Sequence, residues 1–145
     1  MGRKRKHPRS RCPINCVLEV FGDAWTLLIV RDALYAGKRR FGEFLNSEEG
    51  IATNILADRL ERLVRHGILR QVQPRMGREG PVYEPTRKAL ALLPVLVEMA
   101  LWGERYDARS GAPSATMRRI RSDREVFIDA IVERVRAGLP GLPSW

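Results

Sequence analysis

The stretch that decides the fold is GIATNILADRLERLVRHGIL, residues 50–69, which follows RRFGEF at residues 39–44. Leu56, Leu60 and Leu63 recur at i, i+4 and i+7, and this spacing predicts a helix over about 52–66 with one apolar stripe. A shorter helix is expected over 41–46, with residues 47–50 as the turn between the two. His66-Gly67 is typical of a helix C-terminus, because glycine readily takes the positive φ found there.

A basic hairpin should follow this pair of helices. Residues 68–73 are expected to form a strand, and Val82-Tyr83 begins the return strand. The tip between them, residues 74–81, contains glycines and the arginines Arg75 and Arg78. This order of elements predicts a winged helix-turn-helix fold, which is mainly α-helical with a small β-wing. The elements are a short helix, a turn, a longer helix and a basic hairpin. Such an architecture places one helix in the DNA major groove.

Flanking helices are expected on both sides of this motif. Residues 13–21 and 24–36 form two helices, and the second is apolar nearly all round, so it should be the centre of the core. Thr86 should cap a long helix that runs to about residue 106, with a kink or register break at Pro94. Residues 109–116 resemble a linker, Ser122 to Glu125 form a capping box for a last helix, and residues 139–145 form a Pro/Gly-rich tail. The expected division is a basic disordered arm (1–11), a winged helix-turn-helix domain (12–106), and a linker with a C-terminal dimerisation or accessory helix (107–145).

The charge of the chain is concentrated at its start. The 145 residues carry a net charge of +9, and residues 1–11 hold six of the 26 Lys and Arg and no acid. Such an arm favours contact with phosphates, although a solvated tail that only aids solubility has the same composition. No secretory apolar run follows the arm, and residues 89–102 are too short and interrupted to span a bilayer. The two cysteines are consistent with a reducing cytoplasm, so we expect a cytoplasmic, nucleoid-associated protein without a membrane partner.

The exposed face of the 52–66 helix offers side chains that can read bases. Asn bonds adenine, Arg bonds guanine and Asp accepts from cytosine. The expected base readers are Thr53, Asn54, Asp58 and Arg62. Phosphate or minor-groove contacts are expected from Arg59, from Arg39 and Arg40 before the short helix, and from Arg75 and Arg78 at the wing tip. The alternative is an ordinary solvated helix face and a loop whose arginines serve solubility.

Cys12 stands at or before the N-terminus of the first helix, next to Arg9 and Arg11. The helix dipole and the two cations favour its thiolate, so Cys12 is a candidate sensor of oxidants or electrophiles. The alternative is that Cys12 and Cys16 are small apolar residues in a dimer contact. With only His7 and His66 as further ligands, we expect no metal site. The chain also lacks a Gly-rich phosphate loop and a Ser-His-Asp set, so it is not expected to be an enzyme or to need a cofactor.

The stripe from Leu92 to Trp102 has more apolar surface than a monomer of this size buries easily. We therefore expect a two-fold homodimer, although simple core packing is the alternative. Its interface is expected to include Phe21, Leu96, Met99 and Trp102. A dimer would suit two DNA half-sites roughly 34 Å apart.

Several short motifs occur together in one order: Cys12-Pro13, Gly22-Asp23-Ala24-Trp25, Arg40-Phe41-Gly42-Glu43, Gly50-Ile51, Gly67-Ile68, Tyr83-x-x-Thr86 and Leu92-Leu93-Pro94. By these motifs the chain resembles the HxlR-type winged helix-turn-helix regulators, a group similar to the MarR family, over Cys12 to about Tyr106. Three residues depart from the family pattern. Ala52 stands where a serine often caps the recognition helix, and Pro85 and Ala89 stand where Leu and Gly are common.

The resemblance implies a homodimeric transcription factor that binds double-stranded DNA and represses or activates genes. It also implies that the cysteine matching Cys12 senses quinones, aldehydes or oxidants, so a small-molecule or oxidant effector is expected. The prediction is therefore a sequence-specific homodimeric regulator, with a non-specific architectural DNA-binding protein as the alternative.

Overall fold

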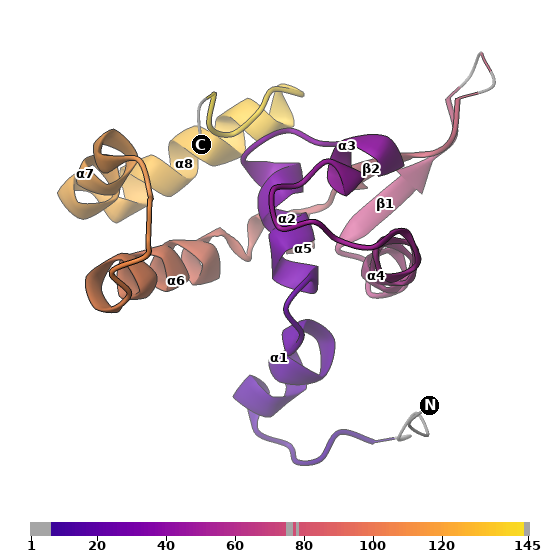
Figure 1. The fold of residues 1–145 in the computed structure, drawn as a ribbon, viewed down its shortest axis with the longest axis horizontal. Coiled ribbons are helices and arrows are strands. Elements are labelled where there is room, and N and C mark those ends of the chain that lie inside the picture. Colours follow the sequence, from indigo (N-terminus) through magenta and orange to yellow (C-terminus); the bar gives the residue numbers. More distant parts are fainter. Residues whose placement is uncertain (1–6, 75–76, 78, 144–145) are drawn as a thin grey trace.

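The structure is a computed structural model that describes residues 7–74, 77 and 79–143. Helices dominate it, and one small antiparallel sheet is present, so the predicted fold class is confirmed (Figure 1). The elements are α1 (Pro13–Phe21), α2 (Thr26–Leu34), α3 (Phe41–Leu45), α4 (Thr53–Arg65), β1 (Leu69–Val72), β2 (Val82–Pro85), α5 (Arg87–Leu90), α6 (Leu93–Tyr106), α7 (Ser114–Ser122) and α8 (Arg124–Arg136).

The core forms around α2, as the sequence predicted. Val30, Ala33 and Leu34 of this helix have no exposed surface. The predicted stripe of α4, which consists of Leu56, Leu60 and Leu63, is likewise fully buried. Burying a leucine side chain contributes roughly 1.5–3 kcal/mol, so this stripe fixes which face of α4 points outward.

The wing is a two-stranded antiparallel sheet in which Leu69 pairs with Pro85 and Val72 pairs with Val82. A third segment joins its edge, because Arg40 forms an isolated bridge with Val82 and the Tyr83 N–H donates to the Arg39 carbonyl at 2.7 Å. The start of α3 is therefore tied to the wing. The predicted tip contacts Arg75 and Arg78 lie outside the described residues.

The long helix expected over 86–106 is divided into α5 and α6, as Pro94 predicted. Pro94 lies in the first turn of α6, where its missing N–H leaves no helical hydrogen bond unmade. Thr86 stands at the N-cap position of α5, as the sequence predicted, but its side chain makes no capping hydrogen bond, since its hydroxyl donates to the carbonyls of Gly67 at 2.7 Å and Ile68 at 3.1 Å. Thr86 instead joins the wing-to-helix junction to the end of α4.

The C-terminal region differs most from expectation. Residues 114–116 belong to α7, a helix that the linker prediction missed, and the cap of α8 is Asp123, which accepts from the Val126 N–H at 3.0 Å. The expected tail is docked, because the N–H groups of Gly141 and Leu142 each donate at 2.9 Å to the carbonyls of Leu34 and Tyr35. These carbonyls end α2 and have no partner within the helix, so the tail completes the hydrogen bonding of the core helix.

Helix α1 projects away from the other elements (Figure 1), and none of its residues is buried. No single helix in the described ranges is long and apolar enough to cross a membrane; α1 and α2 reach that length and composition only as a pair bent by 83°. Of the predicted basic arm, residues 1–6 lie outside the described part of the chain.

Candidate nucleic-acid interface

The outer face of α4 presents the predicted base readers nearest its start. Thr53, Asn54 and Asp58 are all exposed, and the Asp58 side chain is 64% accessible. Ala52 precedes the helix and gives no side-chain cap, as its departure from the family pattern implied. Since the leucine stripe anchors the opposite face, these three side chains are fixed on the side of α4 that is open to a large ligand.

Arg59 lies on the flank of α4 and joins it to the start of α2. Its Nε donates to the Asp23 carboxylate at 2.9 Å, and its guanidinium also pairs with Asp58. Asp23 in turn accepts from the N–H groups of Trp25 at 3.0 Å and Thr26 at 3.2 Å, which caps α2 as the sequence predicted. Arg59 was predicted to contact phosphate; in the structure it sets the orientation of α4.

The pKa of Asp23 reflects these contacts. Burial alone would raise it, but hydrogen bonds from the Thr26 side chain, Arg59 and the Trp25 N–H outweigh burial and lower the pKa from 3.8 to about 2. The carboxylate is therefore charged throughout the neutral range and keeps its hold on Arg59.

Arg62 connects α4 to the projecting helix. Its guanidinium donates to the main-chain carbonyl of Glu19 in α1, and Arg62 is half-buried. The predicted base reader thus holds α1 against the recognition helix in this conformation. No pattern local to residues 52–66 could reveal this contact, because its acceptor is 43 residues away in the chain.

Arg39 and Arg40 were predicted to clamp a phosphate, and the structure gives both guanidinium groups intramolecular partners. The Arg39 Nη1 donates to the carbonyls of Ala33 at 2.6 Å and Lys38 at 2.9 Å, and burial lowers the pKa of this guanidinium. Arg40 pairs with Glu79 at 2.6 Å. Arg39 therefore closes the end of α2, and Arg40 fastens the wing to the start of α3.

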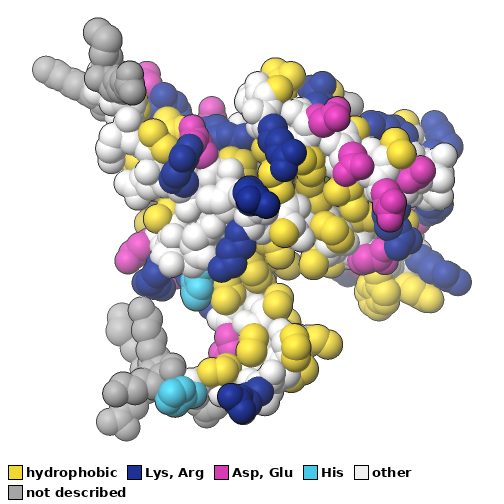
Figure 2. All heavy atoms as spheres, turned by 180° about the vertical axis from the view of Figure 1, so that it is seen from behind, with side chains coloured by type: hydrophobic (Ala, Val, Ile, Leu, Met, Phe, Trp, Pro, Cys, Tyr) yellow, Lys and Arg dark blue, Asp and Glu magenta, His cyan; other side chains and the backbone are white. Residues whose placement is uncertain are grey.

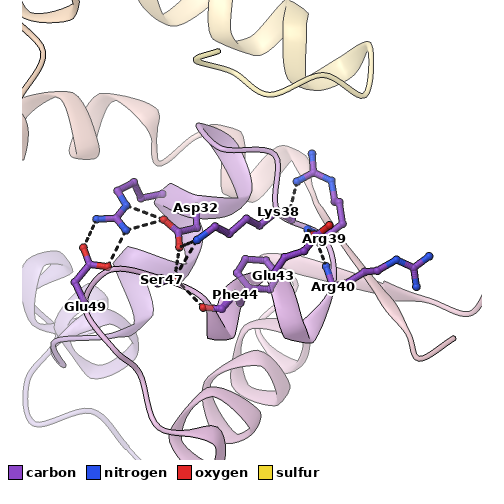
Figure 3. A network of polar contacts seen from close by, with 9 residues as sticks. Asp32, Lys38, Arg39, Arg40, Glu43, Phe44, Ser47 and Glu49 are labelled. Atoms are coloured by element: carbon purple, nitrogen blue, oxygen red, sulfur yellow. Dashed lines mark hydrogen bonds and ion pairs between the residues drawn. The ribbon is translucent and has the colours of Figure 1, made fainter. Parts of the chain in front are cut away.

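A buried polar network lies behind the turn between α3 and α4 (Figure 3). Asp32 of α2 is 5% exposed and accepts from Lys38 Nζ at 2.8 Å and from the Ser47 hydroxyl at 2.5 Å. Arg31 pairs with Asp32 at 2.7 Å and with Glu49 at 2.6 Å. Burial would raise the pKa of Asp32, but the hydrogen bonds from Lys38, Ser47 and Arg31 lower it.

This network fastens the turn to the core helix, and sequence reasoning missed it. The available signal was an adjacent Arg and Asp inside a helix that is otherwise almost wholly apolar. A buried charge is costly unless it is paired, so such residues in a core helix indicate partners from elsewhere in the fold.

Positive charge collects at the C-terminal end of α4. Arg65 is half-exposed, and Lys88 donates to the His66 carbonyl at 2.8 Å. Burial and the cations of Arg62, Arg65 and Lys88 together lower the pKa of His66. On the adjoining wing the Arg70 side chain is 70% exposed and pairs with Glu84. The edge between α4 and β1 thus offers cations to an anionic partner.

Cys12 precedes α1 directly, and both Cys12 and Cys16 are exposed, free thiols. Within the described residues no group of three His, Cys, Asp or Glu side chains is arranged to hold a metal ion.

Of the predicted dimer residues, Met99 and Trp102 are 52% and 67% exposed and Phe21 is half-buried. Leu96 is only 8% exposed and packs in the core of the protomer, so little of its side chain is open to a second copy.

Comparison with known proteins supports a common family for this arrangement. The profile of the HxlR-like helix-turn-helix family matches residues 20–110. An uncharacterized HTH-type transcriptional regulator of Mycobacterium tuberculosis is 36% identical over 101 residues, which cover 70% of this chain and 63% of the relative. The HTH-type transcriptional regulator YodB of Bacillus subtilis is 34% identical over 102 residues, which cover 67% of this chain and 87% of YodB.

Solved structures give the same result. PA1607, described as a candidate transcription factor, superposes with a TM-score of 0.64 at 44% identity over 72% of each chain. Reduced YodB superposes with a TM-score of 0.57 at 25% identity, over 70% of this chain and all of YodB. YodB has also been solved with a quinone bound, and that structure superposes with a TM-score of 0.52 at 28% identity, over 66% of this chain and 99% of YodB. The chain therefore belongs to the HxlR-like helix-turn-helix family, whose matched relatives are named as transcriptional regulators rather than as enzymes.

Proposed function

We propose that the protein is a sequence-specific, double-stranded-DNA-binding transcriptional regulator that acts as a homodimer at the nucleoid in the cytoplasm. The observation that carries this proposal is the exposed polar start of α4, with Thr53 and Asn54 held outward by the buried leucine stripe. Side chains near the start of a recognition helix enter the major groove in helix-turn-helix proteins. The wing arginines, including Arg75 and Arg78, are assigned to the DNA backbone.

The homodimer is supported by apolar surface that the protomer leaves uncovered. In α1 the side chains of Ile14, Val17 and Leu18 are 72%, 46% and 49% exposed. Figure 2 shows hydrophobic side chains on the projecting lobe that holds α1. Met99, Trp102 and Tyr106 of α6 are more than half exposed as well. A second copy that covers both helices would bury this surface, which is larger than scattered exposed hydrophobic residues require.

An effector response is proposed through Cys12. Its thiol is exposed and stands at the start of α1, the helix that the Arg62–Glu19 contact joins to α4. YodB, a relative, has been solved with a quinone bound. A covalent adduct of a quinone at Cys12 would disturb α1 and, through Arg62, the recognition helix.

The test of the proposed function is binding of the purified full chain to the DNA that flanks its own gene, at about 150 mM salt. A scrambled duplex of equal length and composition serves as competitor, because phosphate contacts alone bind both duplexes equally. We expect binding to survive a large excess of scrambled duplex. Equal displacement by both duplexes would favour the alternative function, a non-specific architectural protein whose basic arm supplies most of the affinity.

A further inference from the structure

A cleft of about 920 Å³ opens between α2, the α3–α4 turn, α6 and the C-terminal segments at residues 110–113 and 140–143. This volume lies within the range of small-molecule sites in proteins. The second of these segments lies beyond residues 20–110, the part that matches the family profile. One wall of the cleft is thus contributed by this chain's own C-terminal extension.

The extension is held firmly enough to form a wall. Leu142 is 4% exposed, and its N–H and that of Gly141 donate to the end of α2. The Arg134 guanidinium donates to the Pro140 carbonyl at 2.8 Å. Pro140 and Pro143, which line the cleft, therefore flank a segment that is anchored to both α2 and α8.

Most of the cleft wall is apolar. It includes Leu27, Leu28, Leu96, Ala100, Ala112 and Met99, and the last of these also belongs to the proposed dimer surface. Such a surface accepts the body of a hydrophobic molecule, because transfer of apolar area out of water is favourable.

The polar end of the cleft has a surplus of negative charge. Asp32, Glu48 and Glu49 line it together with two cations, Arg31 and Lys38. Both cations are already committed, Lys38 to Asp32 and Arg31 to Asp32 and Glu49. Glu48 is exposed, and no cation of the described residues pairs with it. The charge that a ligand would meet here is therefore a carboxylate.

We propose that this cleft binds a lipophilic organic cation, with its apolar body between α2 and α6 and its charge near Glu48, and that occupancy changes DNA affinity. The effect of the ligand on DNA affinity rests on the proposed function. Asn46, Glu48 and Glu49 belong to the turn that joins α3 to α4. If the turn has two conformations and the ligand binds one of them more tightly, the ligand shifts the population toward that conformation. The recognition helix follows directly after the turn, so its position shifts as well.

The binding test uses the full chain without DNA and titration calorimetry with two ions of the same shape and opposite charge. Tetraphenylphosphonium should bind, and tetraphenylborate should bind at least roughly tenfold more weakly, the scale expected for a unit charge at a partly exposed site. Glu48→Gln should weaken phosphonium binding roughly tenfold and reduce the difference between the two ions. Glu133→Gln, which removes an exposed carboxylate on α8, is the matched control and should change neither affinity.

A second variant tests the position of the ligand. Gly103 lines the cleft from α6, and a Cβ there meets no atom within 4 Å, so Gly103→Leu should fold and fill the space. We expect it to abolish phosphonium binding. The proposed site would be overturned if the two ions bound with equal affinity or if Gly103→Leu bound phosphonium as well as the original protein does. It would also be overturned if phosphonium did not bind because a second copy of the chain fills the cleft.

The coupling is tested by adding phosphonium to the DNA-binding assay. We expect a several-fold change in affinity for specific DNA in the original protein and none in Gly103→Leu. Phosphonium binding without any change in DNA affinity would overturn the coupling. A protein that fails to bind DNA at all would refute the proposed function, while the DNA-free titration would still decide the cleft.

Discussion

Arg59 of α4 donates to Asp23, the residue that caps α2, and the two side chains are each only 22% exposed. One carboxylate therefore both starts the core helix and orients the recognition helix. A contact of this kind makes the direction of α4 dependent on the integrity of the core.

Replacement of Asp23 by Asn tests this link through pH. The pKa of Asp23 is lowered from 3.8 to about 2 in the folded chain, so its contribution to stability is present above pH 3.8. That contribution is lost as the pH falls from 3.8 to about 2, because below this range Asp23 is protonated in the folded and the unfolded chain alike. Asp23→Asn should cost about 1 kcal/mol at pH 7 and much less near pH 2, measured by urea unfolding. Asp58→Asn, at an exposed partner of Arg59, should change stability by less than about 0.5 kcal/mol, and an equal cost for both variants would contradict the shared-carboxylate interpretation.

Replacement of Asn54 by Ala tests base reading. Loss of an Asn–adenine pair should cost about 1–3 kcal/mol at one base position and relax the preference there, measured on a panel of single-base operator variants. Arg70→Ala is the comparison, since Arg70 is exposed on the wing and should weaken binding to all sequences and flatten the salt slope by about 1. Uniform loss across the panel for Asn54→Ala would exclude a base-reading role.

Replacement of Leu18 by Lys tests the dimer. The side chain is 49% exposed in the protomer, so the change should leave the fold intact while it places a charge in the proposed interface. Analytical ultracentrifugation should show a shift from dimer to monomer. Val126→Lys is matched, because Val126 is 63% exposed on α8, and it should leave the dimer unchanged. A Leu18→Lys protein that remains dimeric would place the interface elsewhere.

Replacement of Gly141 by Ala tests the docked tail. A Cβ at this position would lie 2.5 Å from the Leu34 carbonyl oxygen and 2.7 Å from Ile131 Cγ2, so the tail or the helix must move. We expect a loss of about 1–3 kcal/mol in the free energy of unfolding, as for other overpacked sites. At Gly111 an added Cβ meets no atom within 4 Å, and Gly111→Ala should be close to neutral. Similar stabilities for the two variants would mean that the tail contributes little.

Replacement of Cys12 by Ser tests the sensor. DNA binding of the original protein should weaken on treatment with a benzoquinone, and Cys12→Ser should bind DNA equally well but resist the treatment. Cys16→Ser controls for the second exposed thiol and should still respond. A quinone effect that survives in Cys12→Ser and disappears in Cys16→Ser would assign the sensor to Cys16.

Local patterns sufficed where the physical cause is itself local. The spacing of Leu56, Leu60 and Leu63 predicted both α4 and its buried face, because helix geometry places residues at i, i+4 and i+7 on one side. Pro94 predicted the break before α6 for the same reason, since the missing N–H acts within one turn. Helix α7 escaped prediction because the Gly, Ala, Ser and Pro residues before it are typical of a linker, and its buried residues gain their stability from packing.

The sequence by itself determined the wing and the order of helices around it apart from α7, the outward face of α4 and the family to which the chain belongs. Only the tertiary structure decided what the arginines do, since a guanidinium has five donors and takes whichever acceptors the fold brings within reach. Arg62 meets α1 and Arg59 meets the cap of α2, over separations of 43 and 36 residues. The docking of Gly141 and Leu142 is likewise decided by the unpaired carbonyls at the end of α2, which exist only once that helix has ended in the folded core.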